Sequence, residues 1–148
     1  MELNRDQMQK MFEEIRRGFP RLSMNLQLEH PHVDFSMDIP KQFGLDFDVN
    51  LNLQGDELHL SVGHFWAEWF PCTNPEVVSQ YREAVIGLLS GRFRILELYL
   101  GTHNVGAYLQ QPEGSGWHTT SRSVHGFRWL IPWPRTKKVL QNGNTSAV

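Results

Sequence analysis

Two groups of side chains in this sequence could carry chemistry, and the first lies in residues 64–70, which read HFWAEWF. His64 and Glu68 are the candidate catalytic residues, because an imidazole and a carboxylate can serve as acid and base. Trp66 between them could form a flat platform for a substrate or ligand. A bulge at Gly63 would turn these three side chains toward solvent and place a cleft beside them. The structural alternative is that the aromatic residues of this segment belong to the core.

The second group consists of polar side chains that alternate with apolar ones in the first half of the chain. None of these alternating polar positions is Lys or Arg. Asp and Asn are depleted in strands, so their use here gives up sheet propensity. An anionic surface would attract a basic partner over a range that physiological salt limits to about 8 Å, whereas the alternative is a solubilising face that resists edge pairing. The candidate binding residues are Asp34, Asp38, Asp46, Asp48, Asn50, Asn52, His59 and Trp66.

No metal site and no cofactor are predicted. Asp46, Asp48 and either Asp34 or Asp38 could offer hard oxygen ligands to a divalent cation. Residues that alternate along a flat strand spread apart, however, and do not converge on one ion. Three further histidines lack the spacing of a zinc site: His103, His118 and His125.

Charge is divided unevenly along the chain, whose formal net charge is -2. Residues 22–79 carry one Lys or Arg and nine Asp or Glu, a net charge of −8, whereas residues 80–148 carry eight and three, a net charge of +5. The structural interpretation is that these halves attract each other within one domain. Basic residues near Trp117, Trp129 and Trp133 would suit nucleic-acid binding, but the acidic half and a pI of about 6.4 argue against a nucleic-acid partner.

Hydrophobic periodicity predicts the elements that must position these residues. Helical spacing of Met8, Phe12 and Ile15 predicts an N-terminal helix that ends at Gly18 and Pro20. From residue 22 the period changes to two, which predicts strands with one buried and one solvent-facing side. The predicted strands cover residues 22–28, 33–39, 45–53 and 57–62.

Strand register can be predicted because apolar side chains must face one another across each pair. A two-residue Gly55-Asp56 turn joins the third and fourth strands, and Gly followed by Asp is a favoured hairpin turn. This turn pairs Gln54 with Glu57, Leu53 with Leu58, Leu51 with Leu60 and Val49 with Val62. A turn around His30-Pro31 pairs Leu28 with Val33, Leu26 with Phe35 and Met24 with Met37 by the same rule.

A second helix is predicted from the capping sequence at residues 73–76 to Ser90. Further strands follow at residues 93–100 and 105–109, with a short one at 117–120 after a glycine-rich loop. Whether these strands extend the first sheet or form another is left open.

The predicted fold is one α+β domain over residues 1–134, with an antiparallel sheet and two helices packed on its apolar face. The sheet comprises a four-stranded N-terminal meander plus two to four later strands. Residues 135–148 are predicted to be a basic, flexible C-terminal tail. The single cysteine, Cys72, is expected to be an inert thiol, and with no signal core or membrane span predicted, a cytoplasmic location is expected.

For function, the leading hypothesis is a non-catalytic protein-interaction module, of the inhibitor or adaptor type, that presents an acidic sheet face to a basic partner. The alternative is a small enzyme or ligand-binding protein with a pocket near His64, Trp66 and Glu68. A flat, uncovered face would favour the first hypothesis, and a deep pocket beside that segment would favour the second. The oligomeric state is left open.

Overall fold

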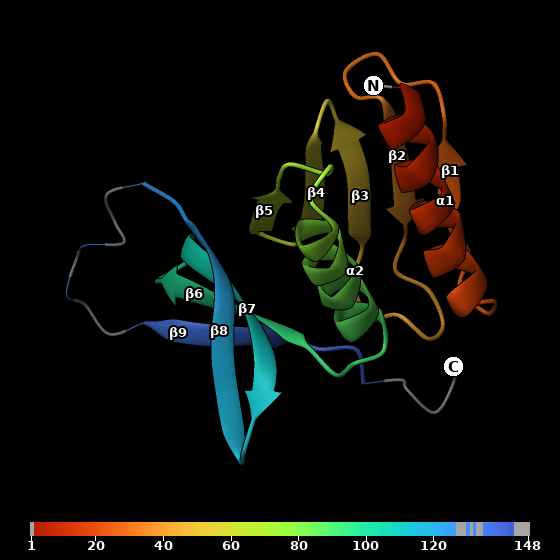
Figure 1. Cartoon of the computed structure of the whole chain (residues 1–148). Helices are drawn as coiled ribbons and strands as arrows, with labels where there is room; N and C mark the ends of the chain where they lie inside the picture. Colours follow the sequence, from red (N-terminus) through yellow and green to blue (C-terminus); the bar gives the residue numbers. More distant parts are fainter. Residues whose placement is uncertain (1, 127–129, 131, 133–134, 144–148) are drawn as a thin grey trace.

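The structure is a computed structural model that describes residues 2–126, 130, 132 and 135–143 (Figure 1). The described residues form two helices, α1 (Glu2–Gly18) and α2 (Pro75–Leu89), and two antiparallel sheets. The fold is therefore α+β, as predicted. Neither helix in this part of the chain is both long enough and apolar enough to cross a membrane.

The strands divide into two sheets, with the orders β1-β2-β3-β4-β5 and β8-β7-β6-β9. The first sheet contains β1 (Asn25–Gln27), β2 (Phe35–Ile39), β3 (Val49–Gln54), β4 (Glu57–Val62) and β5 (Phe65–Trp69). The second contains β6 (Arg94–Leu100), β7 (His103–Glu113), β8 (Gly116–Val124) and β9 (Thr136–Leu140). The meander thus has a fifth strand, and the later strands form a sheet of their own beside β5 (Figure 1).

Both helices pack on the apolar face of the first sheet, as predicted (Figure 1). On α1, Phe12 is fully buried, and its ring centroid lies 4.9 Å from that of Phe35 in an edge-on contact. On α2, Tyr81 is also fully buried, and its hydroxyl donates a 2.7 Å hydrogen bond to the backbone oxygen of His59. Because helices cover one face, the polar side chains of β1–β5 project from the other.

The predicted register of the β3–β4 hairpin is confirmed. Leu53 lies opposite Leu58, and Val49 lies opposite Val62. Gly55 in the turn has a φ of 62°, a left-handed conformation that glycine adopts without steric cost. Local turn chemistry and the apolar pattern therefore specify the same pairing.

The predicted register between the first two strands is wrong. Leu26 lies opposite Met37, whereas Phe35 was expected there. The connection between β1 and β2 is a loop over residues 28–34, longer than the tight turn predicted at His30-Pro31. Because the shift is two residues, the apolar side chains keep their side of the sheet.

The bulge predicted at Gly63 is a two-residue turn instead. Val62 pairs with Phe65 across it, so β5 folds back along β4 and does not continue it. Gly63 has a φ of 57°, which suits the turn. The reversal buries Phe65 and leaves Trp66 and Glu68 exposed, the same facing that a bulge was expected to produce.

The prediction of a flexible tail from residue 135 is wrong for Thr136–Leu140, which form β9 and pair with β6. Most of the side chains of β9 are exposed, so its sequence has no apolar alternation to reveal a strand. Beyond β9, the buried Asn142 uses Nδ2 to donate hydrogen bonds to the backbone oxygens of Gly44 and Leu89, each at 2.8 Å. Residues 144–148 lie outside the described residues.

Glu97 joins the second sheet to the first. Its side chain is buried, with Oε2 accepting a 2.9 Å hydrogen bond from the backbone N–H of His64. Its Oε1 accepts a 3.1 Å hydrogen bond from the hydroxyl of Tyr99. Glu97 therefore anchors the turn between β4 and β5 to strand β6.

Candidate functional site on the outer face of the first sheet

The outer face is the side of the first sheet opposite the helices, and its side chains form rows across neighbouring strands. One row, from β2 to β5, contains Asp38, Asn50, Ser61 and Trp66. The adjacent row contains Ser36, Asn52, His59 and Glu68. Most of the predicted binding residues therefore share this face, together with one of the two catalytic candidates.

An open groove of about 550 Å³ lies on the outer face. Asp38 of β2, Asn50 of β3 and Asp48, which precedes β3, line it together with Asn25 and Ser61. Among the described residues, no Lys or Arg side chain lines this groove. Both carboxylates are on exposed residues, so they can be reached from solvent.

Amide side chains order the floor of the groove. Asn50 Nδ2 donates to Asp38 Oδ1 at 2.6 Å and to Ser36 Oγ at 3.1 Å. Asn52 Nδ2 in turn donates to Asn50 Oδ1 at 3.1 Å. The Asp38 carboxylate is thus held in one place, which reduces the entropy lost when a ligand binds it.

The His59 cluster, formed by Glu57, His59 and Glu68, lies beside these amides. His59 is only 6% exposed, and its Nε2 is 2.9 Å from Glu57 Oε2 and 3.8 Å from Glu68 Oε2. The indole of Trp66 packs next to it, with ring centroids 5.1 Å apart. An imidazole and two carboxylates at such distances can share a proton or hold a divalent cation.

Two of the predicted binding carboxylates are used by the backbone and do not line the groove. Asp34 Oδ2 accepts a 2.7 Å hydrogen bond from the N–H of Gly55 in the β3–β4 turn. Asp46 Oδ2 accepts a 2.9 Å hydrogen bond from the N–H of Gly143, after β9. Their carboxylates therefore have structural roles that the alternating pattern does not reveal.

Asp48 combines a structural role with a place in the groove. Its Oδ1 accepts a 2.7 Å hydrogen bond from the backbone N–H of Lys41. The third strand was predicted from residue 45, but β3 begins at Val49, so Asp46 and Asp48 precede it. Asp48 reaches the groove from this preceding segment.

The two candidate catalytic residues are not brought together. His64 lies in the turn before β5 and Glu68 lies near the other end of that strand, which separates them by roughly 13 Å at strand spacing. The His64 ring instead lies near those of Tyr99 and His125, at centroid distances of 6.0 and 6.5 Å. Direct proton transfer between His64 and Glu68 would require hydrogen-bond reach, which this spacing does not provide.

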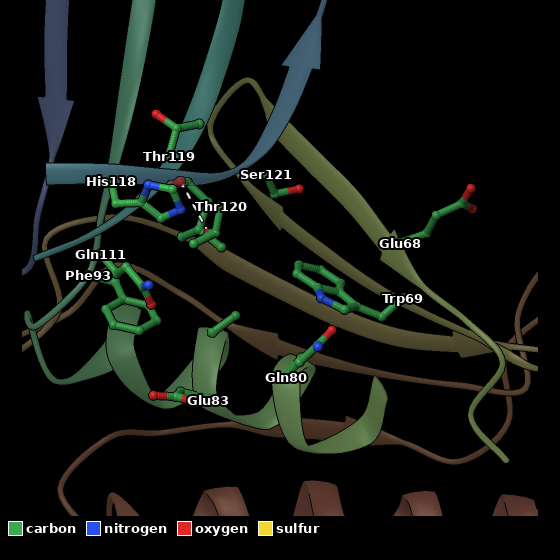
Figure 2. A pocket seen from close by; sticks show the side chains of 12 residues that line it. Glu68, Trp69, Gln80, Glu83, Phe93, Gln111, His118, Thr119, Thr120 and Ser121 are labelled. Carbon is green, nitrogen blue, oxygen red and sulfur yellow. Dashed lines mark hydrogen bonds between the residues drawn. The ribbon is translucent and has the colours of Figure 1, made fainter. Parts of the chain in front are cut away.

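A cleft of about 400 Å³ lies beside Glu68, between β5, α2 and the strands β7 and β8. Figure 2 shows Trp69 and Gln80 on one side and Thr120 and Ser121 facing them, with the Glu68 carboxylate turned away from Phe93. Neither His64 nor Trp66 lines the cleft. Glu68 and His64 therefore line different pockets, since His64 lines a separate one of about 300 Å³ that also contains Tyr99 and Lys138.

Burial changes the ionisation of side chains around these sites. It raises the pKa of the Cys72 thiol, and the nearby Asp56 carboxylate adds to the effect, so the thiol remains protonated, as an inert thiol should. Burial also raises the pKa of Tyr99, and its hydrogen bond to Glu97 acts in the same direction. Neither side chain is thereby activated as a nucleophile.

Glu57 was absent from the predicted site, although its parity places it on the same face as His59. The alternation of residues along the strand could therefore have placed Glu57 in the predicted site. The position of Glu68 across from His59 requires the turn at Gly63, and the cleft residues of β8, such as His118, require the packing of the second sheet against the first. Neither of these contacts follows from local sequence.

Comparison of the chain with protein-family models, with curated proteins and with solved structures found no match in any of the three. The function is therefore inferred from the geometry of the outer face and of the cleft.

Proposed function

We propose that the chain is a non-catalytic protein-interaction module, of the inhibitor or adaptor type, whose acidic outer face binds a basic partner. The observation that supports this proposal is the groove. Two exposed carboxylates line it, that of Asp38, across from Asn50, and that of Asp48, two residues before Asn50. A Lys or Arg side chain of the partner would enter the groove and form charge-assisted hydrogen bonds with the two carboxylates.

An aromatic anchor beside the charged groove also supports the proposal. Trp66 is 46% exposed and lies in the same row as Asp38 and Asn50. Exposed tryptophans are enriched among the residues that contribute most to binding at protein interfaces. The indole would cover apolar parts of the partner while the groove takes its charge.

We expect the proposed function to depend on some of the predicted carboxylates more than on others. Asp34 and Asp46 accept hydrogen bonds from backbone N–H groups, so replacing either would disturb the local structure whether or not a partner binds. Asp38 accepts a hydrogen bond from the side-chain amide of Asn50, so it can be neutralised with little effect on the backbone. Neutralising Asp38 is therefore expected to weaken partner binding more specifically than neutralising Asp34.

A second candidate function is the binding of a small ligand in the cleft beside Glu68. Its volume of about 400 Å³ falls within the usual range for ligand sites, roughly 300–1,000 Å³. Trp69 and Phe93 provide apolar walls, and Glu83 and His118 provide charged or polar groups. A ligand with an aromatic ring and a basic group would suit these walls.

The leading proposal is tested with an Asp38→Asn, Asp48→Asn double variant. Asparagine keeps an acceptor oxygen for the Asn50 amide and the Lys41 N–H, so mainly the charge is lost. Proteins captured by the parent chain from a cell lysate are identified, and their affinities are measured by calorimetry at low and high salt. The double variant should bind the captured partner about tenfold more weakly, equivalent to about 1.4 kcal/mol.

The matched control is an Asp6→Asn, Glu14→Gln double variant, which removes the same charge from helix α1 on the opposite side of the sheet. It should bind the partner as the parent does. Salt-insensitive binding, or equal binding by both double variants, would contradict an electrostatic role for the groove. Loss of binding in a Trp69→Ala variant alone would favour the cleft.

A further inference from the structure

We infer that the His59 cluster is a binding site for one divalent transition-metal ion such as Zn²⁺. This inference goes beyond the proposed partner binding and does not depend on it, because Asp38 and Asp48 are not members of the cluster. The cluster offers one imidazole nitrogen and two carboxylates, which are ordinary ligands of zinc in proteins.

The distances within the cluster fit a single ion. One ligand atom from each of Glu57, His59 and Glu68 lies within 4.8 Å of the others. Ligands placed tetrahedrally at zinc's usual bond lengths are about 3.3 Å apart. The two distances from His59 Nε2, 2.9 and 3.8 Å, lie on either side of that value. Small side-chain rotations would therefore complete three sides of a tetrahedron.

The cluster combines one fixed ligand with two adaptable ones. The His59 side chain is largely buried, and its backbone oxygen is held by the hydroxyl of Tyr81 at 2.7 Å. The side chains of Glu57 and Glu68 are 39% and 36% exposed, so they can rotate toward an ion without disturbing the core. The site is open to solvent on the carboxylate side, which provides an entry path and a position for water.

A buried acceptor on the neighbouring strand could help to orient the His59 ring when a metal binds. Asn52 lies directly across from His59 in the β3–β4 pair. Its Oδ1 is buried and has no hydrogen-bond partner among the described residues. Buried polar atoms nearly always have a partner, so this oxygen is suited to a water molecule or a ring N–H that is oriented when a metal binds.

The ligand set selects the class of ion. Ca²⁺ and Mg²⁺ favour all-oxygen sites with six or more ligands, whereas an imidazole suits zinc and its neighbours among the transition metals. Two carboxylates and a neutral imidazole balance the charge of a divalent ion. The pair formed by His118 and Glu113, 3.3 Å apart on β7 and β8, lacks a third ligand in the described part of the chain.

The test is calorimetric titration of Zn²⁺ into the full chain after treatment with a chelator and dialysis. We expect saturable binding of one ion per chain at micromolar Zn²⁺, with millimolar Ca²⁺ or Mg²⁺ unable to compete. Glu68→Gln and Glu57→Gln should each weaken binding at least about tenfold, since even outer-shell changes commonly cost that much. Glu113→Gln is the matched control and should leave the affinity unchanged.

Two results would overturn the site: no saturable Zn²⁺ binding by the parent chain, or equal affinities in Glu57→Gln, Glu68→Gln and Glu113→Gln. Circular dichroism verifies that each variant is folded. If the cluster variants do not fold, the parent is titrated with Co²⁺, whose paramagnetism should selectively broaden the NMR signals of His59 and Trp66. Absence of that broadening would equally refute the proposal. Failure of zinc binding would leave the Asp38, Asp48 groove unaffected.

Discussion

The two sheets of this protein are stabilised in different ways. The first sheet buries one face under two helices, and residues such as Phe12, Leu51 and Tyr81 are fully buried there. In the second sheet, β8 alternates between exposed and half-buried side chains, and β9 is mostly exposed. Apolar burial is the dominant stabilising contribution in folding, so we expect the first sheet to control global stability.

The outer strand β8 of the second sheet makes cation–π contacts with both β7 and β6. The Arg94 guanidinium lies 4.2 Å from the centroid of the Trp117 ring, and that of Arg122 lies 5.4 Å from that of Tyr108. Such cross-strand contacts contribute less than a core side chain. Strands β6 and β7 contribute Ile95, Ala107 and Leu109 to the common core, so β8 and β9 are the strands that depend on attachment to a buried scaffold.

The largest effect is expected from Phe12→Ala, which empties the core between α1 and the first sheet. Removal of a fully buried phenylalanine should lower the free energy of unfolding by about 3–5 kcal/mol. Urea denaturation measures the loss. Val139→Ala in β9, where the side chain is 44% exposed, should cost less than about 1 kcal/mol. Similar losses in the two variants would remove the distinction between the sheets.

Glu97→Ala should give the next largest effect, because it removes hydrogen bonds that attach the second sheet to the first. The variant leaves the His64 N–H and the Tyr99 hydroxyl without their acceptor, at a cost of about 2 kcal/mol. Hydrogen exchange at the His64 amide should become faster, and urea denaturation should show the lower free energy of unfolding. Glu113→Ala, an exposed change on β7, should alter stability by less than about 0.5 kcal/mol.

Alkaline pH should weaken the first sheet more than the second. Burial raises the pKa of Tyr81 well above its ordinary value, so the unfolded chain ionises this tyrosine first, at a pH of about 10. Stability is therefore intact below that pH and falls as the pH rises further. Tyr81→Phe should make stability fall less steeply with rising pH. At neutral pH the same variant should be less stable by about 1 kcal/mol, because it lacks the hydrogen bond to the backbone oxygen of His59.

Tyr108→Phe provides the comparison in the second sheet. Burial also raises the pKa of Tyr108, but the nearby guanidiniums of Arg122 and Arg135 lower it in part. Thermal unfolding measured between pH 8 and 11 should therefore show that the Tyr108→Phe variant still loses most of the stability that the parent loses at alkaline pH. An equal flattening by Tyr108→Phe would mean that the two sheets share the effect.

The smallest effect is expected from Trp117→Ala, which removes the ring beneath Arg94. The cation–π contact at this half-exposed site contributes about 0.5–1 kcal/mol. Amide exchange should become faster in β8 while the exchange of α1 and β3 stays unchanged. A loss as large as that of Phe12→Ala would show that β8 is part of the scaffold.

Local sequence predicts much of the first sheet and of its outer face. The β3–β4 pairing follows from the Gly55-Asp56 turn, and parity places Asn50, Asn52 and His59 together on one side. The β1–β2 register was missed because a loop of seven residues, 28–34, does not specify pairing as a tight turn does. Strand β9 was missed because its exposed faces leave no periodic pattern.

The sequence by itself determined that polar side chains would share the outer face, because alternation along a strand is a property of neighbouring residues. Only the tertiary structure decided which of them meet. The turn at Gly63 places Glu68 across from His59. Backbone N–H groups hydrogen-bond the carboxylates of Asp34 and Asp46, and strands of the second sheet line one side of the cleft. These outcomes depend on contacts between residues that lie far apart in the sequence, so the pattern of neighbouring residues does not predict them.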